Sequence, residues 1–331
     1  MGDPGNPDWA GGGDNDNRGG VDYEFKIGRF EVNTAQWVEF MNAAFDRPAN
    51  DLIPFVHAPS AWSATRITPQ NGGTRRWAVP TGGDMNAVGG VNWRVSAIYC
   101  NWLHNGKGTD RAAFLDGAYD VSTFGSYLGG DTYTDQLAHH PAARYWIPTL
   151  DEWIKAAHWD PNKNGPGEGG YWTWANSSDQ PPRYGPPGQL VNGLPTTANG
   201  GWTPSTWPGF DPFAIPLNAY PTALSPWGLA DTAGATSEWT EAAGISPGEM
   251  FLRDRYSEGS AWALGAFSSD HVQSPLNGIF PMWSLYDVGL RVAAAVPAPG
   301  PLSGLAIVAT FTFSRQRRRA DRLTTRPCYV V

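Results

Sequence analysis

Residues 147–162 read IPTLDEWIKAAHWDPN. Thr149 followed by Glu152 is the pattern of a capping box, in which each side chain accepts a hydrogen bond from the other residue's backbone N–H and so fixes the start of a helix. The apolar side of this helix would consist of Trp153, Ile154 and Ala157. Pro161 lacks a backbone N–H and is expected to end it. This stretch therefore predicts a short amphipathic helix.

Nearer the N-terminus, residues 21–32 alternate between apolar and polar side chains, which is the period of a half-buried strand. The apolar members are Tyr23, Phe25, Ile27, Phe30 and Val32. Asn33 and Gln36 then form a variant of the capping box. The apolar spacing that follows predicts a helix over about 34–45.

A further helix is predicted within residues 91–106, VNWRVSAIYCNWLHNG, with Asn105 and Gly106 as its stop signal. Cys100 lies inside this helix. A free cysteine in such a position usually packs as a small apolar residue, so we expect its thiol to be buried and unreactive.

The composition favours short elements joined by ordered turns. The 331 residues include 40 glycines, 29 prolines and 17 tryptophans, and only 16% are charged, which is typical of neither a helix bundle nor a disordered chain. The net charge is -8 without a basic stripe among the aromatics, so nucleic acid is not an expected partner.

Two cysteines, Cys100 and Cys328, exclude a disulfide framework and a thiolate zinc site. His139 and His140 are adjacent and would point apart, so they do not favour a metal site.

Five segments stand out in order along the chain. They are VDYEFKIGRFEVNTAQWVEFMNA (21–43), VNWRVSAIYCNWLHNG (91–106), YWIPTLDEWIKAAHWDP (145–161), SPWGLADTAGATSEWTE (225–241) and GLRVA (289–293). Together they resemble the signature blocks of the formylglycine-generating enzyme (sulfatase-modifying factor) domain family. The resemblance implies an α+β, C-type-lectin-like fold with few helices, small antiparallel sheets and much irregular chain.

Active members of that family oxidise a sulfatase cysteine to formylglycine with molecular oxygen and a copper ion held by two cysteines. Counted back from Gly289, the matching positions fall near Ala263 and Ser268 in this chain. Soft thiolates hold copper(I), and a methyl group with a hydroxyl does not replace them. No cysteine lies between 101 and 327. The sequence therefore predicts no catalytic residue, no certain cofactor and no copper.

The fourth segment also covers a calcium-binding motif of the family, which here reads GATSEW over 234–239. The resemblance implies that the carbonyls of Gly234 and Thr236 and the carboxylate of Glu238 help to bind calcium, which takes roughly six to eight oxygens. The motif's asparagine and first tryptophan are an alanine and a serine here. The alternative is that Glu238 hydrogen-bonds local backbone in a turn, and the sequence leaves both open.

The C-terminal residues resemble a PEP-CTERM sorting segment. VPAPG at 296–300 precedes an apolar run over 302–313 and an arginine cluster at 315–319. The run is short for a membrane-spanning helix, which needs about 20 residues, and the arginines favour the cytoplasmic side. The resemblance implies export, processing by exosortase-type machinery, and membrane contact only through this segment. The alternative is a last core strand followed by a basic tail.

These patterns divide the chain into a flexible N-terminal segment (1–20), a formylglycine-generating-enzyme-like domain (21–295), the sorting segment (296–319) and a tail (320–331). No basic and apolar stretch of a signal peptide is visible. The first residues, MGDPGN, nevertheless resemble the sequence that follows the signal peptide in exported relatives. We therefore expect that the printed sequence starts after its signal.

Two functions are compatible with this sequence. The first is an exported, non-catalytic binding or structural module of the cell surface, outer envelope or extracellular space, with a carbohydrate or envelope component as its partner. Tryptophans exposed in the loops of 161–227 would stack on sugar rings, although most tryptophans of this region are expected to pack in the core. The second is an active formylglycine-generating oxidase, which the resemblance alone supports. The missing cysteine pair favours the first.

Overall fold

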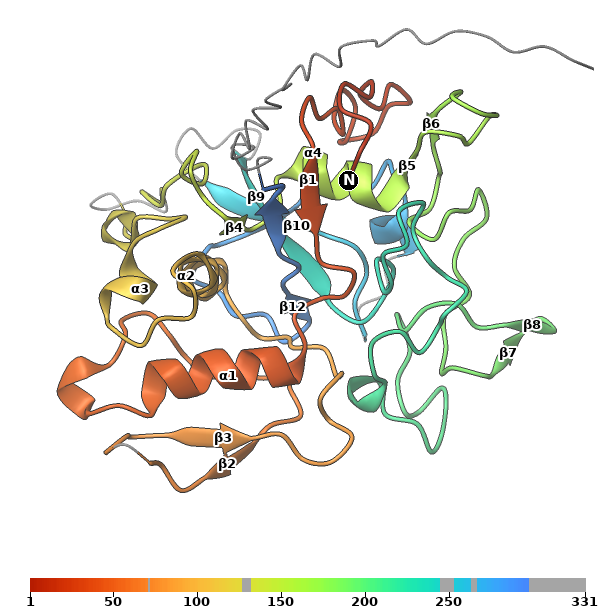
Figure 1. Ribbon diagram of the computed structural model, residues 1–331. Coiled ribbons are helices and arrows are strands. Elements are labelled where there is room, and N and C mark those ends of the chain that lie inside the picture. Colours follow the sequence, from red (N-terminus) through yellow and green to blue (C-terminus); the bar gives the residue numbers. More distant parts are fainter. Residues whose placement is uncertain (71, 127–131, 245–252, 263–266, 298–331) are drawn as a thin grey trace, which may run out of the picture. The chain divides into compact units, whose positions relative to one another are not determined.

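The computed structural model describes residues 1–70, 72–126, 132–244, 253–262 and 267–297 (Figure 1). The chain divides into two units at Val296, and every described helix and strand lies in the first of them. Among the described residues, no helix is long and apolar enough to cross a membrane. The sorting segment predicted for 296–319 lies almost wholly outside the described residues and stays a prediction.

The helices form where local signals predict them. The described α-helices are α1 (Thr34–Phe45), α2 (Trp93–His104), α3 (Ala112–Leu115) and α4 (Leu150–His158), and the short 3-10 helices are η1 (Ala49–Asp51), η2 (Val121–Thr123), η3 (Pro212–Ala214) and η4 (Phe267–Asp270). Asn33 and Thr149 both make complete capping boxes, which confirms the predicted starts of α1 and α4. α2 ends at Asn105 as predicted. α4 ends before Pro161 because the chain continues as a strand from Trp159.

A three-stranded sheet joins segments from three distant parts of the chain. β1 (Phe25–Ile27) pairs antiparallel with β13 (Ala293–Ala295), which pairs antiparallel with β4 (Tyr145–Trp146). The strand predicted over 21–32 is longer than the observed one, because β13 provides partners only for β1. After β1 the backbone makes isolated hydrogen bonds in place of a strand ladder. For example, the N–H of Val32 donates to the carbonyl of Leu290.

β9 is the central strand of a second sheet, whose order is β11–β10–β9–β12. These strands are β9 (Ser237–Gly244), β10 (Asp254–Glu258), β11 (Asn277–Ile279) and β12 (Val288–Gly289). β12 runs parallel to β9, whereas the other described pairings of named strands are antiparallel.

The remaining strands form pairs: β2 (Thr65–Ile67) with β3 (Arg76–Ala78), β5 (Trp159–Asp160) with β6 (Gly170–Tyr171), and β7 (Leu190–Val191) with β8 (Leu194–Pro195). α1 lies along the β2–β3 hairpin (Figure 1).

Aromatic side chains fill the core between these short elements. The almost fully buried tryptophans include Trp37, Trp93, Trp102, Trp153, Trp239 and Trp262. Trp37 stacks on Tyr99 with ring centroids 4.9 Å apart and so joins α1 to α2. Each such ring removes about 150–250 Å² from water, which gives short elements the burial that longer helices and strands obtain from many small side chains.

Residues 1–20 pack onto the rest of the domain, which corrects the prediction of a flexible segment. The side-chain amide of Asn6 donates to the carbonyl of Gly19 at 2.8 Å and to the hydroxyl of Tyr171 at 3.0 Å. Its oxygen accepts from the N–H of Val21 at 3.1 Å. The composition of residues 1–20 predicts polar side chains in solvent, but Asn6 instead makes hydrogen bonds with buried polar groups.

Candidate functional site

A buried ion pair joins the fourth and fifth of the segments singled out above. The side chains of Arg291 and Glu238 are 0% and 1% exposed. The guanidinium donates from Nη2 to Oε1 at 2.6 Å and from Nε to Oε2 at 2.9 Å, which is a two-pronged contact. The indole N–H of Trp153 on α4 donates to Oε2 at 2.7 Å. Both carboxylate oxygens of Glu238 are therefore occupied by protein donors.

The guanidinium of Arg291 also binds backbone. Its Nη1 donates to the carbonyls of Gly28 at 3.0 Å and Arg29 at 2.8 Å, and its Nη2 donates to the carbonyl of Ala230 at 3.0 Å. Burying a charge is costly unless it is paired and hydrogen-bonded. Arg291 meets both conditions and ties the chain after β1 to the loop before β9.

Two further carboxyl groups lie close to this pair. Glu31 accepts from the N–H of Thr236 at 3.2 Å and from its hydroxyl at 2.5 Å. Asp231 accepts from the N–H of Asn218 at 2.6 Å. Burial, with a further contribution from Glu238, raises the pKa of Glu31 well above its usual range. Burial also raises the pKa of Asp231 to about 6.

We call these four residues the acid–arginine network: Glu31, Asp231, Glu238 and Arg291. One guanidinium faces three buried carboxyl groups in it, so the raised pKa values favour protonation of the acids that Arg291 does not neutralise. Such a network stabilises one arrangement of the surrounding chain, and it offers no open position for a substrate.

The residues predicted to bind calcium lie together at the start of β9. Gly234, with φ at 90°, sits against the backbone of Asn199, and Thr236 and Glu238 are engaged as described above. The alternative, a bond from Glu238 to local backbone, is also not what the structure has, because its partners are distant side chains. No group of three or more His, Cys, Asp or Glu side chains that could hold a metal ion occurs in the described part of the chain. Calcium binding stays a prediction, and these contacts weigh against it.

Calcium is accordingly expected to leave the melting temperature unchanged. A ligand that binds only the folded state raises the melting temperature by mass action, but Glu238 would first have to release Arg291, at a cost of about 3–5 kcal/mol. Melting curves in excess calcium and in EGTA should superimpose. An increment with calcium that Glu238→Gln abolishes would establish the site instead.

The two positions that match the family's copper cysteines are only partly visible. Ala263 lies outside the described residues, and Ser268 lies in η4 with its side chain outside them. Next to them, the buried carboxylate of Asp270 accepts from the N–H and the hydroxyl of Ser260, both at 2.7 Å, and from the hydroxyl of Tyr184. Burial raises the pKa of Asp270 to about 6. This carboxyl group connects the two ends of the segment that would carry the copper ligands.

Cys100 is fully buried on α2, which confirms the predicted burial of its thiol. Burial raises the pKa of this thiol well above its usual range, and the nearby carboxylate of Glu241 adds to the effect. Because the thiolate is the nucleophile and the metal ligand, Cys100 is poorly suited to either role.

His139 makes a contact that the sequence does not predict. Its Nδ1 lies 3.0 Å from Oε1 of Glu241, and its ring stacks on Trp146 with centroids 4.5 Å apart. The hydroxyl of Tyr119 donates to the same carboxylate oxygen at 2.7 Å. His140 is exposed, so the two adjacent histidines do point apart. Glu241 is far from His139 in sequence, and no local spacing could have indicated the pair.

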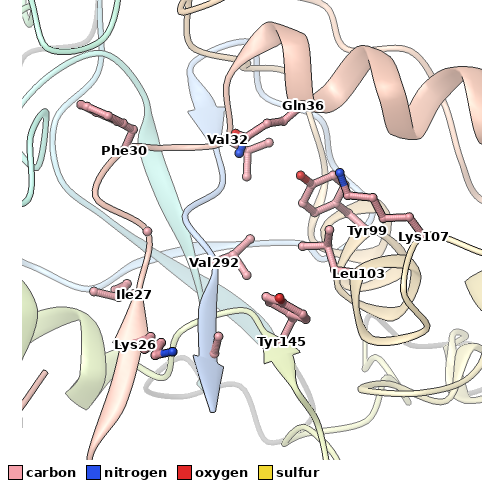
Figure 2. A pocket seen from close by; sticks show the side chains of 12 residues that line it. Lys26, Ile27, Phe30, Val32, Gln36, Tyr99, Leu103, Lys107, Tyr145 and Val292 are labelled. Atoms are coloured by element: carbon pink, nitrogen blue, oxygen red, sulfur yellow. The ribbon is translucent and has the colours of Figure 1, made fainter. Parts of the chain in front are cut away.

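A pocket of about 310 Å³ opens between α1, α2 and the β1–β13–β4 sheet (Figure 2). Its apolar lining includes Ile27, Phe30, Val32, Leu103 and Val292, and its polar lining consists of Lys26, Gln36, Tyr99, Lys107 and Tyr145. No local pattern predicts this pocket, because its walls come from distant segments that only the folded chain brings together.

The family model of the sulfatase-modifying factor enzyme 1-like domain matches residues 17–296. The chain belongs to this family. Among solved structures it is similar to CarF, with 17% identity over 82% of this chain and 87% of that one and a TM-score of 0.49. It is also similar to Treponema denticola variable protein 1, with 18% identity over 85% of this chain and 90% of that one and a TM-score of 0.45. A third similar structure is PvdO from Pseudomonas aeruginosa, with 14% identity over 83% of this chain and 82% of that one and a TM-score of 0.42. No curated protein matches it.

In this sulfatase-modifying factor domain, the signature segments meet in the core. Glu31, Glu238 and Arg291 belong to the first, fourth and fifth segments, and Trp153, which bonds Glu238, belongs to the third. The second segment joins the fourth through two indole N–H groups: Trp93 donates to the carbonyl of Thr240 at 3.1 Å and Trp239 donates to the carbonyl of Val91 at 2.9 Å. The signature residues of the C-type-lectin-like fold therefore hold this domain together.

Proposed function

We propose that this chain is an exported, non-catalytic member of the sulfatase-modifying factor family, which binds a component at the cell surface or outside the cell. The proposal has two parts, the absence of the family's oxidation chemistry and the export of the domain. Different observations support each part.

The cysteine content carries the first part. The sequence has no cysteine between 101 and 327, and Cys100 is buried on α2. Oxidation of a peptide cysteine by the family's route needs two accessible thiolates that hold copper(I). The residues that this chain shares with the family support folding, as the contacts of Glu238 and Arg291 illustrate.

The alternative is an active formylglycine-generating oxidase. Family membership alone favours it, and a fold does not establish a reaction. The experiment that separates the two is oxidation of a sulfatase-motif peptide, which the chain is expected to leave unchanged.

A binding role is supported by an exposed apolar surface near the end of the domain. Met282, Trp283, Leu285 and Tyr286 are each between 37% and 50% exposed. Within the described residues, the tryptophans of 161–227 are buried or half-buried, as expected of core residues, so they offer less surface to a sugar. Trp283 is the better candidate for stacking on a sugar ring of a carbohydrate or envelope component.

The C-terminal sequence supports export, with exosortase-type machinery as the processing partner. Deletion of 296–331 is expected to leave the melting temperature unchanged, because every described helix and strand precedes Val296. The same deletion should alter the location of the protein, which without the deletion should reach the envelope or extracellular fraction with its C-terminus removed.

The measurement is thermal unfolding of both proteins, together with fractionation and mass spectrometry of the C-terminus in the native host. A deletion variant that fails to fold would mean that the apolar run over 302–313 is part of the core. An intact C-terminus on cytoplasmic protein would also defeat the export proposal.

A further inference from the structure

The strand register builds one wall of the pocket between α1, α2 and the three-stranded sheet. Lys26 pairs with Ala294, and Ala294 pairs with Tyr145. Directly paired residues of neighbouring strands share one face of a sheet, so these three side chains lie side by side. The small side chain of Ala294 lies between two large ones in this register and so leaves space in the pocket wall.

α2 contributes a polar group to this space that makes no hydrogen bond with the described residues. Tyr99 and Leu103, one helical turn apart, face the pocket. Tyr99 is only 3% exposed, and its hydroxyl has no hydrogen-bond partner among the described residues. Figure 2 shows this hydroxyl facing the space bordered by Val32 and Val292. Burial raises the pKa of Tyr99, so the hydroxyl remains a donor. The hydroxyl is not fully enclosed, so it is a donor that opens to the pocket, where water or a ligand would accept from it.

The charge of the lining indicates what kind of acceptor would fit. Lys26 and Lys107 line the pocket, and none of the lining residues is acidic. Lys107 pairs with Glu39, which lies outside the lining, at 2.5 Å. Lys26 has no ion-pair partner among the described residues. Among the lining residues, Lys26 is therefore a positive charge that no described ion pair balances, and it lies beside apolar side chains.

We propose that this pocket binds a small amphipathic carboxylate, whose apolar body lies on Ile27, Val32 and Val292 and whose carboxylate accepts from the hydroxyl of Tyr99. This inference goes beyond the proposed function, because none of the residues that line the pocket belongs to the exposed surface around Trp283. A volume of about 310 Å³ is at the lower end of the range for small-molecule sites, and it suits a ligand the size of a medium-chain fatty acid.

The test uses octanoate as the probe, with octylammonium as its charge-reversed counterpart, in calorimetric titrations of the full chain at low ionic strength. Octanoate should bind at one site and at least about tenfold more tightly than octylammonium, since a hydrogen bond to a charged group is worth about that factor. Tyr99→Phe should weaken octanoate binding about tenfold for the same reason. It should not lower the melting temperature, because the lost hydroxyl makes no hydrogen bond with the part of the chain that the structure describes.

Matched variants separate the pocket from the rest of the surface. Lys26→Gln should weaken octanoate binding about threefold at low salt and less at high salt, because it removes part of a screened field. Arg66→Gln also removes one positive charge, at an exposed position outside the lining, and should have no effect. Equal affinity for the two probes, undiminished octanoate binding by Tyr99→Phe, or no saturable binding of octanoate would each overturn the inference.

These outcomes are distinct from failure of the proposed function. If octanoate does not bind while a sulfatase-motif peptide stays unoxidised, only the ligand class is wrong. If the peptide is oxidised, the non-catalytic proposal is wrong whatever octanoate does.

Discussion

Replacing Arg291 by methionine is expected to lower the free energy of unfolding by about 3–5 kcal/mol, the usual cost of removing one partner of a buried ion pair. The substitution leaves Glu238 without its guanidinium while Glu31 and Asp231 stay buried beside it. It also leaves the carbonyls of Gly28, Arg29 and Ala230 without this donor. Since domains are stable by only about 5–15 kcal/mol, a large part of the stability depends on one side chain.

Urea unfolding of Arg291→Met and of Arg66→Met measures this effect. Arg66 is exposed on β2, and its replacement should change the free energy by no more than about 0.5 kcal/mol. The double variant Glu238→Gln with Arg291→Met should regain part of the loss, because it removes the uncompensated charge. Equal unfolding midpoints for the two arginine variants would show that the acid–arginine network does not support the fold.

Replacing Glu258 by glutamine is expected to change how stability depends on pH. Glu258 is buried in β10, and its Oε1 has no hydrogen-bond partner in the described part of the chain. Its other oxygen accepts from the hydroxyl of Ser274 at 3.1 Å. Burial raises the pKa of Glu258 from 4.5 to about 8. The folded state therefore holds this proton more tightly than the unfolded state does.

The direction of the pH dependence follows from the difference between the pKa of Glu258 in the folded and the unfolded state. The stability that protonated Glu258 contributes is complete below pH 4.5 and is lost as the pH rises through 8. The advantage of Glu258→Gln over wild type should therefore grow by about 4 kcal/mol between pH 5 and pH 9. Urea unfolding at both pH values measures the change, with the exposed Glu168→Gln as the control. If the difference between variant and wild type is the same at both pH values, Glu258 is not held protonated by the fold.

Helix starts could be predicted from sequence because their determinants are local. Asn33 with Gln36 and Thr149 with Glu152 lie within one helical turn, and both capping boxes form as predicted. The strand predicted over 21–32 is longer than the observed β1. Alternation of apolar and polar residues indicates which residues can form a strand, but it does not show how many residues of β13 are available to pair with them.

The site could be predicted only in part, because its contacts are not local. Glu238 was selected by its motif, but its partners Arg291 and Trp153 follow only from the folded chain. The pairing of His139 with Glu241 and the unpartnered hydroxyl of Tyr99 leave no local pattern. The same limitation explains why residues 1–20 were predicted to be flexible, since the partners of Asn6 include Tyr171.

Oxidation of a sulfatase-motif peptide by the purified full-length chain tests the central claim most directly. The peptide would be incubated with oxygen, a reductant and copper(I), and its cysteine followed by mass spectrometry, with an active member of the family as the positive control. The account predicts no peptide aldehyde above the level without protein, because no thiolate pair is present to hold the metal. Copper-dependent formation of the aldehyde by this chain would contradict it.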